Sequence, residues 1–449
     1  MQQTANIAQF YADKTIFITG TTGFVGKVIL EKIMRSLGNF RHLYVMVRAK
    51  KGMSNIERLQ MIFESDIFEP YFCENPEMRK GWTKKVSPIA GDLTKNGLGL
   101  SQKDQDTILN EVNVIINSAA SVNFDDPILD ALNINYHGCM RILSLAKRAK
   151  QLDVLTHVST AYVNSNRQGY IEEKIFPNEN GKETDQIIEE LMKLNPQQAK
   201  EREKEIIGKY PNTYTYTKAL TERSLLQKHE HVNICIVRPS IVLSTYQEPF
   251  SGWTQSISAL GAFLFAAILG LINFLQCDKN VILDIVPCDV VSNLIISATS
   301  HVGQGRKGTF KLYHSSSSTQ QPIPIVTIMK ILLDFSRTNK SQRQVFNPFI
   351  TTVPNKKLYD MLFLFTKVLP ITALQIISKL PVIGSKERQV MADNFKRLLL
   401  KMQDMQGLFL HFTHNEFLYE SKAQDALWEC MSAEERKNFF FNIREVDWK

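Results

Sequence analysis

Tyr214 and Lys218 stand four positions apart in the run YTYTK, a spacing that would place both side chains on one face of a helix. The pKa of a free tyrosine hydroxyl is about 10, and a nearby ammonium favours the phenolate and lowers that pKa. Tyr214 could then donate a proton to an oxygen that becomes negative, with Lys218 assisting it. Tyr216 has no such partner, because Leu220 stands four positions after it.

A second hydroxyl donor is expected near this pair. The β-branched run that starts at Val154 ends in Ser159 and Thr160, and parallel sheets present functional side chains at strand ends. Either hydroxyl could stabilise an oxyanion beside Tyr214. His157, inside the same run, is interpreted as a structural histidine and not as an acid or base.

The glycine-rich run GTTGFVG (20–26) lies between a predicted strand and a predicted helix. Glycines at this place let the backbone turn sharply and approach a pyrophosphate held by the helix N-terminus. An ordinary turn between a strand and a helix is the alternative interpretation. The pattern predicts a dinucleotide site with these contacts: Gly20, Thr22, Gly23, Phe24, Val25 and Gly26.

Arg48 ends the second predicted strand and is followed by Lys50 and Lys51. An NAD site usually carries an acidic residue there, which binds the ribose 2′-hydroxyl. Cations suit a 2′-phosphate instead, so the sequence predicts NADPH; a solvated basic turn is the alternative. Further cofactor contacts are expected at the next two strand ends, from Asp92, Leu93, Asn117 and Ala119.

The elements that must position these residues follow from a repeating pattern. β-rich runs at 15–20, 42–47, 86–90, 112–117, 154–159 and 234–238 alternate with helical patterns, which predicts an α/β fold with a parallel sheet covered on both faces. The charged stretch 169–210 predicts one or two solvated helices over the sheet. Residues 315–324, rich in Ser, Gln and Pro, predict a linker, and the chain beyond them has a mainly helical pattern.

Two long apolar runs raise the question of a membrane. Residues 257–275 approach the length of about 20 that spans a bilayer, but a crossing there would separate the Tyr214 region from the predicted strand 281–286 of the same sheet. Lys367, Pro370 and Lys379 interrupt the run 361–383. We therefore expect both runs to form an apolar surface lying in one leaflet. The alternative is that 257–275 forms a buried helix.

Composition limits the partners. The 449 residues carry a net charge of +8, which favours an anionic surface or ligand. The sequence has no zinc-finger, RNP-like or basic–aromatic pattern, so nucleic acid is not expected. Six scattered cysteines predict reduced thiols, no metal site is predicted, and the N-terminal sequence predicts no secretory signal.

The glycine turn, Ser159-Thr160, the Tyr214 and Lys218 pair, and Arg238-Pro239-Ser240 together resemble the extended short-chain dehydrogenase/reductases. Longer stretches are similar to the alcohol-forming fatty acyl-CoA reductases. They lie at 19–26, 157–164, 171–174, 211–220, 284–287 and 412–417, although a Trp is more usual where Phe417 stands.

This resemblance implies a Rossmann-like doubly wound sheet over residues 1–320 and a mainly helical C-terminal domain over 321–449. It implies Thr160, Tyr214 and Lys218 as catalytic residues, with Lys218 and Pro239 also contacting the cofactor. The implied reaction reduces a long-chain acyl-CoA to a fatty alcohol with two NADPH. The implied location is the cytosolic face of an intracellular membrane, the endoplasmic reticulum or the peroxisome.

Two other classes of function stay open. Nucleotide-sugar epimerases and dehydratases of the same superfamily use a similar Tyr and Lys on a polar substrate, although the long apolar runs speak against a sugar site. A non-catalytic NADPH-binding scaffold would leave the Ser/Thr, Tyr and Lys set without a role.

Overall fold

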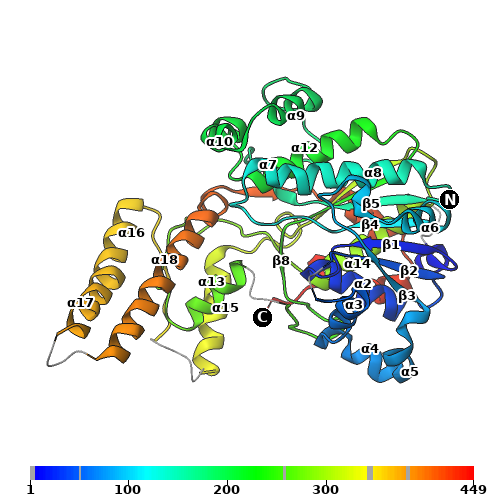
Figure 1. Cartoon of the computed structure of the whole chain (residues 1–449). Helices are drawn as coiled ribbons and strands as arrows, with labels where there is room; N and C mark the ends of the chain where they lie inside the picture. The colour runs from blue at the N-terminus through cyan, green and yellow to red at the C-terminus, as the bar shows by residue number, and fades with distance from the viewer. Residues whose placement is uncertain (1–5, 50–51, 256–258, 341–346, 381–384, 449) are drawn as a thin grey trace. The chain divides into compact units, whose positions relative to one another are not determined.

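The computed structural model describes residues 6–49, 52–255, 259–340, 347–380 and 385–448, and it contains a sheet of seven parallel strands (Figure 1). The chain builds this sheet outward from β1 to β3 on one side and from β4 to β11 on the other, so the strand order reverses between β1 and β4. Doubly wound sheets bind ligands at the carboxyl ends of the strands beside such a reversal. The predicted Rossmann-like α/β fold is therefore confirmed. In spatial order the strands are β11 (Phe310–Ser315), β7 (Ile234–Pro239), β5 (Val154–Val158), β4 (Val114–Asn117), β1 (Thr15–Thr19), β2 (His42–Val47) and β3 (Val86–Ala90).

Helices cover both faces of the sheet. In Figure 1, α8 (Gly138–Arg148) and α12 (Thr213–Lys228) lie above it, and α2 (Phe24–Ser36) and α14 (Cys288–Gly303) lie below it. Every residue of β1, β4, β5 and β7 is buried. Strands that are mainly apolar and buried along their whole length are typical of a parallel sheet covered on both sides.

Two local predictions were wrong. The linker expected at 315–324 begins at the end of an unpredicted strand, β11, and Ser316, Ser317 and Ser318 are buried. Their polar composition serves a turn inside the protein, since Asp284 accepts hydrogen bonds from the backbone N–H groups of Ser317 and Ser318 at 2.8 and 3.0 Å. The charged insert forms three short helices instead of one or two: α9 (Thr184–Met192), α10 (Pro196–Glu201) and α11 (Glu203–Ile207).

The chain divides into two compact units. The first contains the sheet and comprises residues 1–255, 284–321 and 418–447; the second comprises 256–283, 322–417 and 448–449. The C-terminal segment belongs to the first unit because Glu420 N–H donates to Ile171 O at 2.9 Å and Ala423 N–H donates to Glu173 at 2.7 Å. The division into domains 1–320 and 321–449 stays a prediction, and the compact units group 256–283 and 418–447 differently.

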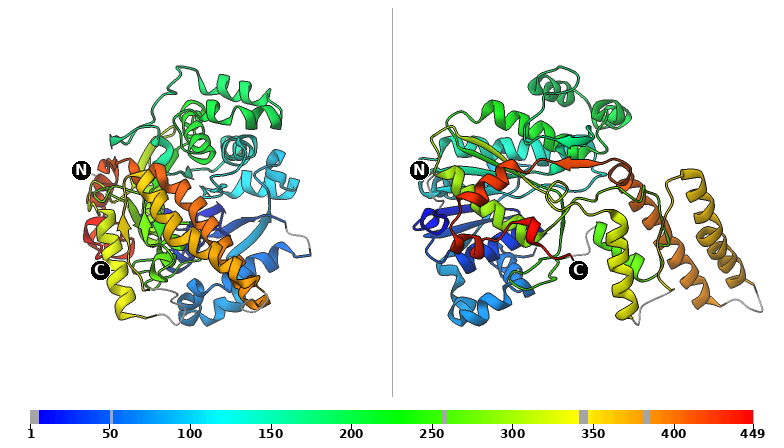
Figure 2. Two further views of the ribbon diagram at one scale, coloured as in Figure 1. Left: turned by 90° about the vertical axis from the view of Figure 1, so that its left-hand side faces the viewer. Right: turned by 180° about the vertical axis from the view of Figure 1, so that it is seen from behind.

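The second unit is mainly helical (Figure 2). Its α16, η6 and α17 run on as one helix over 356–378, and α17 packs along α18. Two short strands, β9 (Phe274–Leu275) and β12 (Thr351–Thr352), pair in parallel. The helices of this unit are α13 (Ala259–Ile268), α15 (Ile325–Thr338), α16 (Lys356–Phe363), η6 (Leu364–Val368), α17 (Leu369–Ser378) and α18 (Lys386–His414).

The two apolar runs differ in how far the protein buries them. In the run 257–275, whose first two residues lie outside the described part, the helix ends at Ile268 and Gly270 takes a left-handed conformation with φ +75°. Ala267, Leu269 and Leu271 are buried in the core of the second unit, so this half of the run follows the buried alternative and does not form the expected surface. The helix 356–378 is largely exposed. Among the described residues it alone is long and apolar enough to cross a membrane, with a mean hydropathy of 1.7.

Candidate active site

The glycine turn between β1 and α2 lies against the end of β4. Gly20 has φ +82°, and a Cβ there would lie 2.6 Å from the backbone nitrogen of Ala119. A Cβ on Gly26 would lie 2.3 Å from the carbonyl oxygen of Gly20. Both positions therefore need glycine so that the turn can close and meet the neighbouring strand.

The N-terminus of α2 fits a phosphate. Gly23 is its N-cap and supplies no capping side chain, and the first turn has no acidic residue. The first N–H groups of a helix lack partners inside the helix and carry partial positive charge, so an anion stabilises them. Phe24 and Val25 are half-buried in this first turn, while Thr22 is exposed and its carbonyl accepts a hydrogen bond from Gln255 at 2.8 Å. These residues fit the pyrophosphate of a dinucleotide.

Arg48 and Asp92 lie together at the ends of β2 and β3. Arg48 Nε is 3.6 Å from Asp92 Oδ2, and the Arg48 side chain is 61% exposed. Burial opposes ionisation of Asp92, but hydrogen bonds from Thr94 and the Arg48 charge outweigh it and hold the pKa of Asp92 below its usual value. Leu93 is buried beside them. Lys50 and Lys51 lie outside the described residues, and a second cation, Arg58, donates to the carbonyl oxygen of Arg48.

Asn117 belongs to the framework under the site. It is buried, its Oδ1 accepts a hydrogen bond from the Thr19 hydroxyl at 2.8 Å, and its Nδ2 lies 3.2 Å from His157 Nδ1. Ala119 N–H donates to the same Thr19 hydroxyl at 3.2 Å. Burial lowers the pKa of His157 well below its usual value, so this ring is neutral and lies inside the sheet, as we expect of a structural histidine.

Tyr214 and Thr160 meet where α12 begins. Asn212 caps this helix by accepting a hydrogen bond from Thr215 N–H at 2.9 Å, which places Tyr214 in the first turn. The Thr160 hydroxyl lies close enough to Tyr214 to lower the pKa of its phenol, and it donates to the carbonyl oxygen of Pro239 at 3.4 Å. The ends of β5 and β7 and the start of α12 thus converge on two hydroxyl groups.

Lys218 is 2% exposed and its ammonium donates to Val158 O at 2.8 Å. Burial lowers the pKa of Lys218 to about 8, against the opposing charge of Glu222. The ring of Tyr214 is only half-buried by surface area, yet the surrounding protein raises the pKa of Tyr214 to about 12, and the Thr160 hydrogen bond offsets part of that rise. The expectation that Lys218 lowers the pKa of Tyr214 was therefore wrong. Tyr214 keeps its proton at neutral pH, as a proton donor must.

Sequence reasoning missed two residues that shape the site. Phe124 stacks on Tyr214 with ring centroids 5.9 Å apart. Asn135 lies in a π-helical turn, accepts a hydrogen bond from Ser121 N–H at 2.9 Å and donates to the Thr217 hydroxyl at 3.2 Å. Asn135 thus ties the loop after β4 to α12. Neither residue lies near Tyr214 in the sequence, and the π-helical turn that carries Asn135, a feature often found at functional sites, is visible only in the structure.

Comparison with known proteins agrees with this geometry. Residues 18–295 match the family described as male sterility protein. A putative fatty acyl-CoA reductase of Drosophila melanogaster is 32% identical over 448 residues, covering 98% of this chain and 84% of the relative. Fatty acyl-CoA reductase 1 of Xenopus laevis is 31% identical over 443 residues, covering 99% and 83%. This chain belongs to the fatty acyl-CoA reductase family.

As a member of the fatty acyl-CoA reductase family, the chain is an NAD(P)-dependent oxidoreductase. Its fold is also that of solved reductase domains. The terminal reductase domain from the myxalamid biosynthetic pathway has a TM-score of 0.60 at 19% identity, covering 93% of this chain and 85% of that one. A reductase domain of a nonribosomal peptide synthetase from Mycobacterium tuberculosis has a TM-score of 0.58 at 15% identity, covering 98% and 94%.

Proposed function

We propose that this fatty acyl-CoA reductase family member uses NADPH to reduce a long-chain acyl-CoA to a primary fatty alcohol. The observation that carries the proposal is the placement of the Tyr214 phenol and the Thr160 hydroxyl beside each other, where β5 ends and α12 begins. A protonated phenol and a neighbouring hydroxyl can together stabilise an oxygen that becomes negative during reduction. The family membership supports the acyl thioester as the group that carries this oxygen.

Each residue of the site has a separate role in the proposed reduction. NADPH, when bound, supplies the hydride. Tyr214 donates its proton to the carbonyl oxygen, Thr160 holds that oxygen by a second hydrogen bond, and Lys218 contacts the nicotinamide ribose. The carbon–sulfur bond of the first product then breaks, CoA leaves as the thiol, and an aldehyde remains. The same two hydroxyls serve a second reduction, from aldehyde to alcohol.

The preference for NADPH rests on Arg48. This guanidinium is exposed at the end of β2, where it can bind a 2′-phosphate. Its Nε lies 3.6 Å from Asp92 Oδ2, which is too long for a strong hydrogen bond. Asp92 and Leu93 would lie near the adenine, and Asn117, Ala119 and Pro239 would border the rest of the cofactor. A 2′-phosphate would bind this guanidinium through charge-assisted hydrogen bonds.

Membrane contact is proposed for the helix 356–378, which we place in one leaflet on the cytosolic face of an intracellular membrane. Its exposed apolar side chains recur at helical spacing: Met361, Phe365, Val368, Leu369 and Ile376 are 38–61% exposed. A crossing is disfavoured because α18 packs along α17 and carries charged residues such as Asp393 and Arg397. Each such charge at the centre of a bilayer costs about 2.5–3.5 kcal/mol.

One experiment tests the reaction. The purified chain is incubated with NADPH and palmitoyl-CoA, a UDP-sugar or no substrate, while NADPH absorbance is followed and products are separated by gas chromatography. We expect hexadecanol and two NADPH oxidised for each thioester. Accumulated aldehyde with one NADPH per thioester would contradict the alcohol product. Turnover of the UDP-sugar alone would restore the epimerase or dehydratase alternative.

A further inference from the structure

Residues 245–255, called the strap below, follow the short strand β8 (Ile241–Leu243) and belong to the unit that contains the sheet. The strap closes on itself. Trp253 N–H donates to the Thr245 hydroxyl at 2.9 Å, and Thr245 N–H donates to Trp253 O at 3.0 Å. The Thr245 hydroxyl in turn donates to Phe250 O at 2.7 Å. These bonds fix the shape of the strap from within.

The first half of the strap is held between α14 and α2. The carboxylate of Asp289, in the first turn of α14, accepts the backbone N–H groups of Tyr246, Gln247 and Glu248 at 2.8, 2.8 and 2.9 Å. Hydrogen bonds to a carboxylate are among the stronger ones in proteins. Glu248 also forms an ion pair with Lys32 of α2. The strap is therefore anchored to both helices.

The second half of the strap lies on the glycine turn. Gln255 Nε2 donates to Thr22 O at 2.8 Å. The rings of Trp253 and Phe24 have centroids 5.6 Å apart and planes 32° apart, and Trp253 is buried. Thr22 and Phe24 flank Gly23, the N-cap of α2, so the strap contacts the turn at both neighbours of that residue.

These contacts fix the peptide group between Thr22 and Gly23. Gly23 N–H donates to Gly20 O at 2.9 Å, and Gln255 donates to the carbonyl oxygen of the same peptide group. Because a trans peptide is planar, its C=O and N–H point in opposite directions, and holding both fixes its orientation. Glycine residues would otherwise give this turn wide conformational freedom. The strap thus restricts the turn just before the N–H groups that fit a phosphate.

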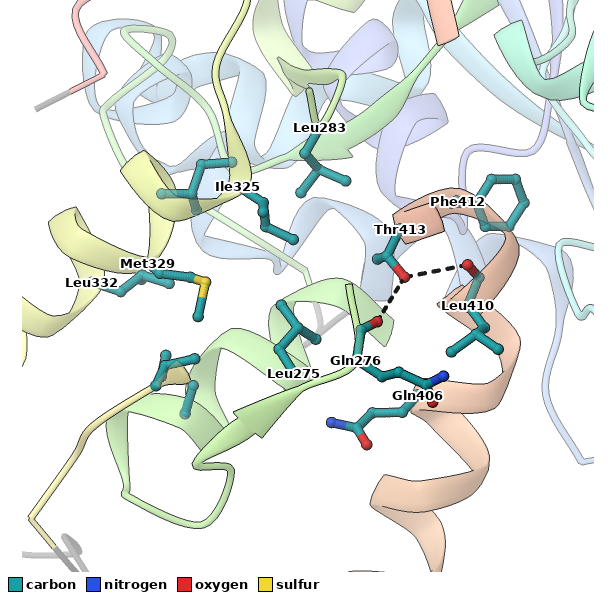
Figure 3. A pocket seen from close by; sticks show the side chains of 13 residues that line it. Leu275, Gln276, Leu283, Ile325, Met329, Leu332, Gln406, Leu410, Phe412 and Thr413 are labelled. Atoms are coloured by element: carbon teal, nitrogen blue, oxygen red, sulfur yellow. Dashed lines mark hydrogen bonds between the residues drawn. The ribbon is translucent and has the colours of Figure 1, made fainter. Parts of the chain in front are cut away.

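The Gln255 contact differs from one that only packs a core. At the apolar pocket of the second unit, the Thr413 hydroxyl donates to the carbonyl oxygens of Gln276 and Leu410, each at 3.3 Å (Figure 3). Thr413 and Gln276 are buried, so such a bond satisfies polar groups that folding has removed from water. Gln255 is exposed, and ordering its long side chain costs conformational entropy. Its bond to Thr22 therefore acts on the turn and not on a core.

We infer that Trp253 and Gln255 are positioning residues of the cofactor site, which hold the glycine turn in the conformation that binds the pyrophosphate of the dinucleotide. This inference rests on the cofactor site proposed at that turn. A turn that is already ordered loses less conformational entropy on binding, so the affinity for the dinucleotide is higher. NADPH and NADH both carry the pyrophosphate. The strap should therefore strengthen the binding of both, unlike Arg48.

A change of one exposed side chain tests the hydrogen bond to the turn. Gln255→Leu removes the donor to Thr22 O, and Gln247→Leu makes the same change at another exposed position of the strap. Calorimetric titration of the purified full chain gives the Kd for NADPH and for NADH without relying on turnover. We expect Gln255→Leu to raise both Kd values about fivefold and Gln247→Leu to change them less than about twofold.

A matched pair of tryptophan variants separates positioning from folding. Trp253 and Trp82 are 7% and 6% exposed, and Trp82 packs on Phe63, with ring centroids 4.9 Å apart. We expect Trp253→Leu to raise the Kd of both dinucleotides about tenfold or more, and kcat at saturating NADPH to fall less than KM for NADPH rises. Trp82→Leu should lower the melting temperature but change Kd less than about twofold.

The outcomes separate this inference from the proposed cofactor site. Parent-like Kd values in Gln255→Leu and in a folded Trp253→Leu would overturn the role of the strap alone. A loss confined to NADPH would also overturn it, because the effect would then lie at the 2′-phosphate. If Trp253→Leu does not fold, Gln255→Leu decides. A parent protein that binds neither dinucleotide would remove the proposed cofactor site, and the inference with it.

Discussion

At the scale of single residues, the site keeps its proton donor protonated and lowers the pKa of its lysine. Tyr214 has a pKa of about 12 and Lys218 a pKa of about 8, and burial causes both shifts. A buried lysine lowers stability unless something offsets its lost hydration. The presence of Lys218 inside the protein is therefore better explained by its chemistry than by its packing.

Removing the Tyr214 hydroxyl tests the proton donor. Tyr214→Phe deletes one oxygen and keeps the ring that stacks on Phe124, so we expect an intact fold and a loss of about 10²-fold or more in kcat. Rates come from NADPH oxidation, and circular dichroism and thermal melting check the fold. A variant that retains more than about a tenth of the parent rate would exclude a general-acid role.

We expect replacement of Lys218 to lower activity without lowering stability. Its pKa is about 8 in the folded state against 10.5 when unfolded, so between these values the unfolded chain binds more protons and stability rises with pH. At pH 7 the buried charge lowers stability. We therefore expect Lys218→Met to lose most activity yet to melt at the same or a higher temperature, and to lack the rise in stability between about pH 8 and 10.5. A large fall in Tm at pH 7 would show that Lys218 is chiefly structural.

Arg48 determines the cofactor preference in our proposal. Its side chain is 61% exposed, so Arg48→Ala should leave stability within about 0.5 kcal/mol of the parent. We expect KM for NADPH to rise about tenfold or more while KM for NADH stays the same, because only NADPH has the 2′-phosphate. Steady-state kinetics with both cofactors measure this. Equal turnover of NADH and NADPH by the parent enzyme would contradict the assignment.

At the scale of elements, the glycine turn joins β1, α2 and the end of β4. A methyl group at Gly26, inside this turn, should be far more disruptive than one at Gly38, outside it. A Cβ at Gly26 would lie 2.3 Å from a backbone oxygen that cannot move without opening the turn, whereas a Cβ at Gly38, after the same helix, meets nothing within 4 Å. We expect Gly26→Ala to lower stability by about 3 kcal/mol and to abolish NADPH binding. Gly38→Ala should change stability by less than about 0.5 kcal/mol. Urea unfolding and NADPH titration measure both, and equal behaviour of the two variants would contradict the role of the turn.

At the scale of the whole molecule, the exposed helix 356–378 predicts where the protein meets lipid. Phe365 and Ile376 are 61% and 60% exposed on it, and we expect the double variant Phe365→Asp, Ile376→Asp to bind vesicles of phosphatidylcholine and phosphatidylserine about tenfold more weakly. The control, Ile56→Asp with Met192→Asp, changes residues of similar exposure in the first unit and should bind like the parent.

The depth of the helix in the membrane is a separate measurement. A helix in one leaflet should leave no fragment protected from protease inside sealed vesicles. A protected fragment containing 356–378 would replace the proposal with a spanning helix. A parent protein that stays in the supernatant after sedimentation with vesicles would remove the membrane contact altogether.

The sequence by itself determined the features that depend on short-range pattern. Mainly apolar, β-branched runs between helical patterns predicted six of the seven sheet strands, because strands covered on both faces are rich in apolar residues. The glycine turn was predictable because few residues other than glycine allow its backbone. The YTYTK spacing placed Tyr214 and Lys218 on one helix, and the helix α12 confirms that placement.

Tertiary structure alone decided the features that depend on burial between distant segments. The run 315–324, rich in Ser, Gln and Pro, has the composition of a linker, but in the fold Asp284 accepts hydrogen bonds from the backbone of Ser317 and Ser318. The run 257–275 looked like a membrane segment, but Gly270 ends its helix early and the remainder packs into a core. The pKa of Tyr214 is raised because the cost of desolvating the phenolate outweighs the help of Thr160, while the ammonium of Lys218 donates to Val158 O on β5. Composition records which groups are polar, but only packing decides which of them keep contact with water.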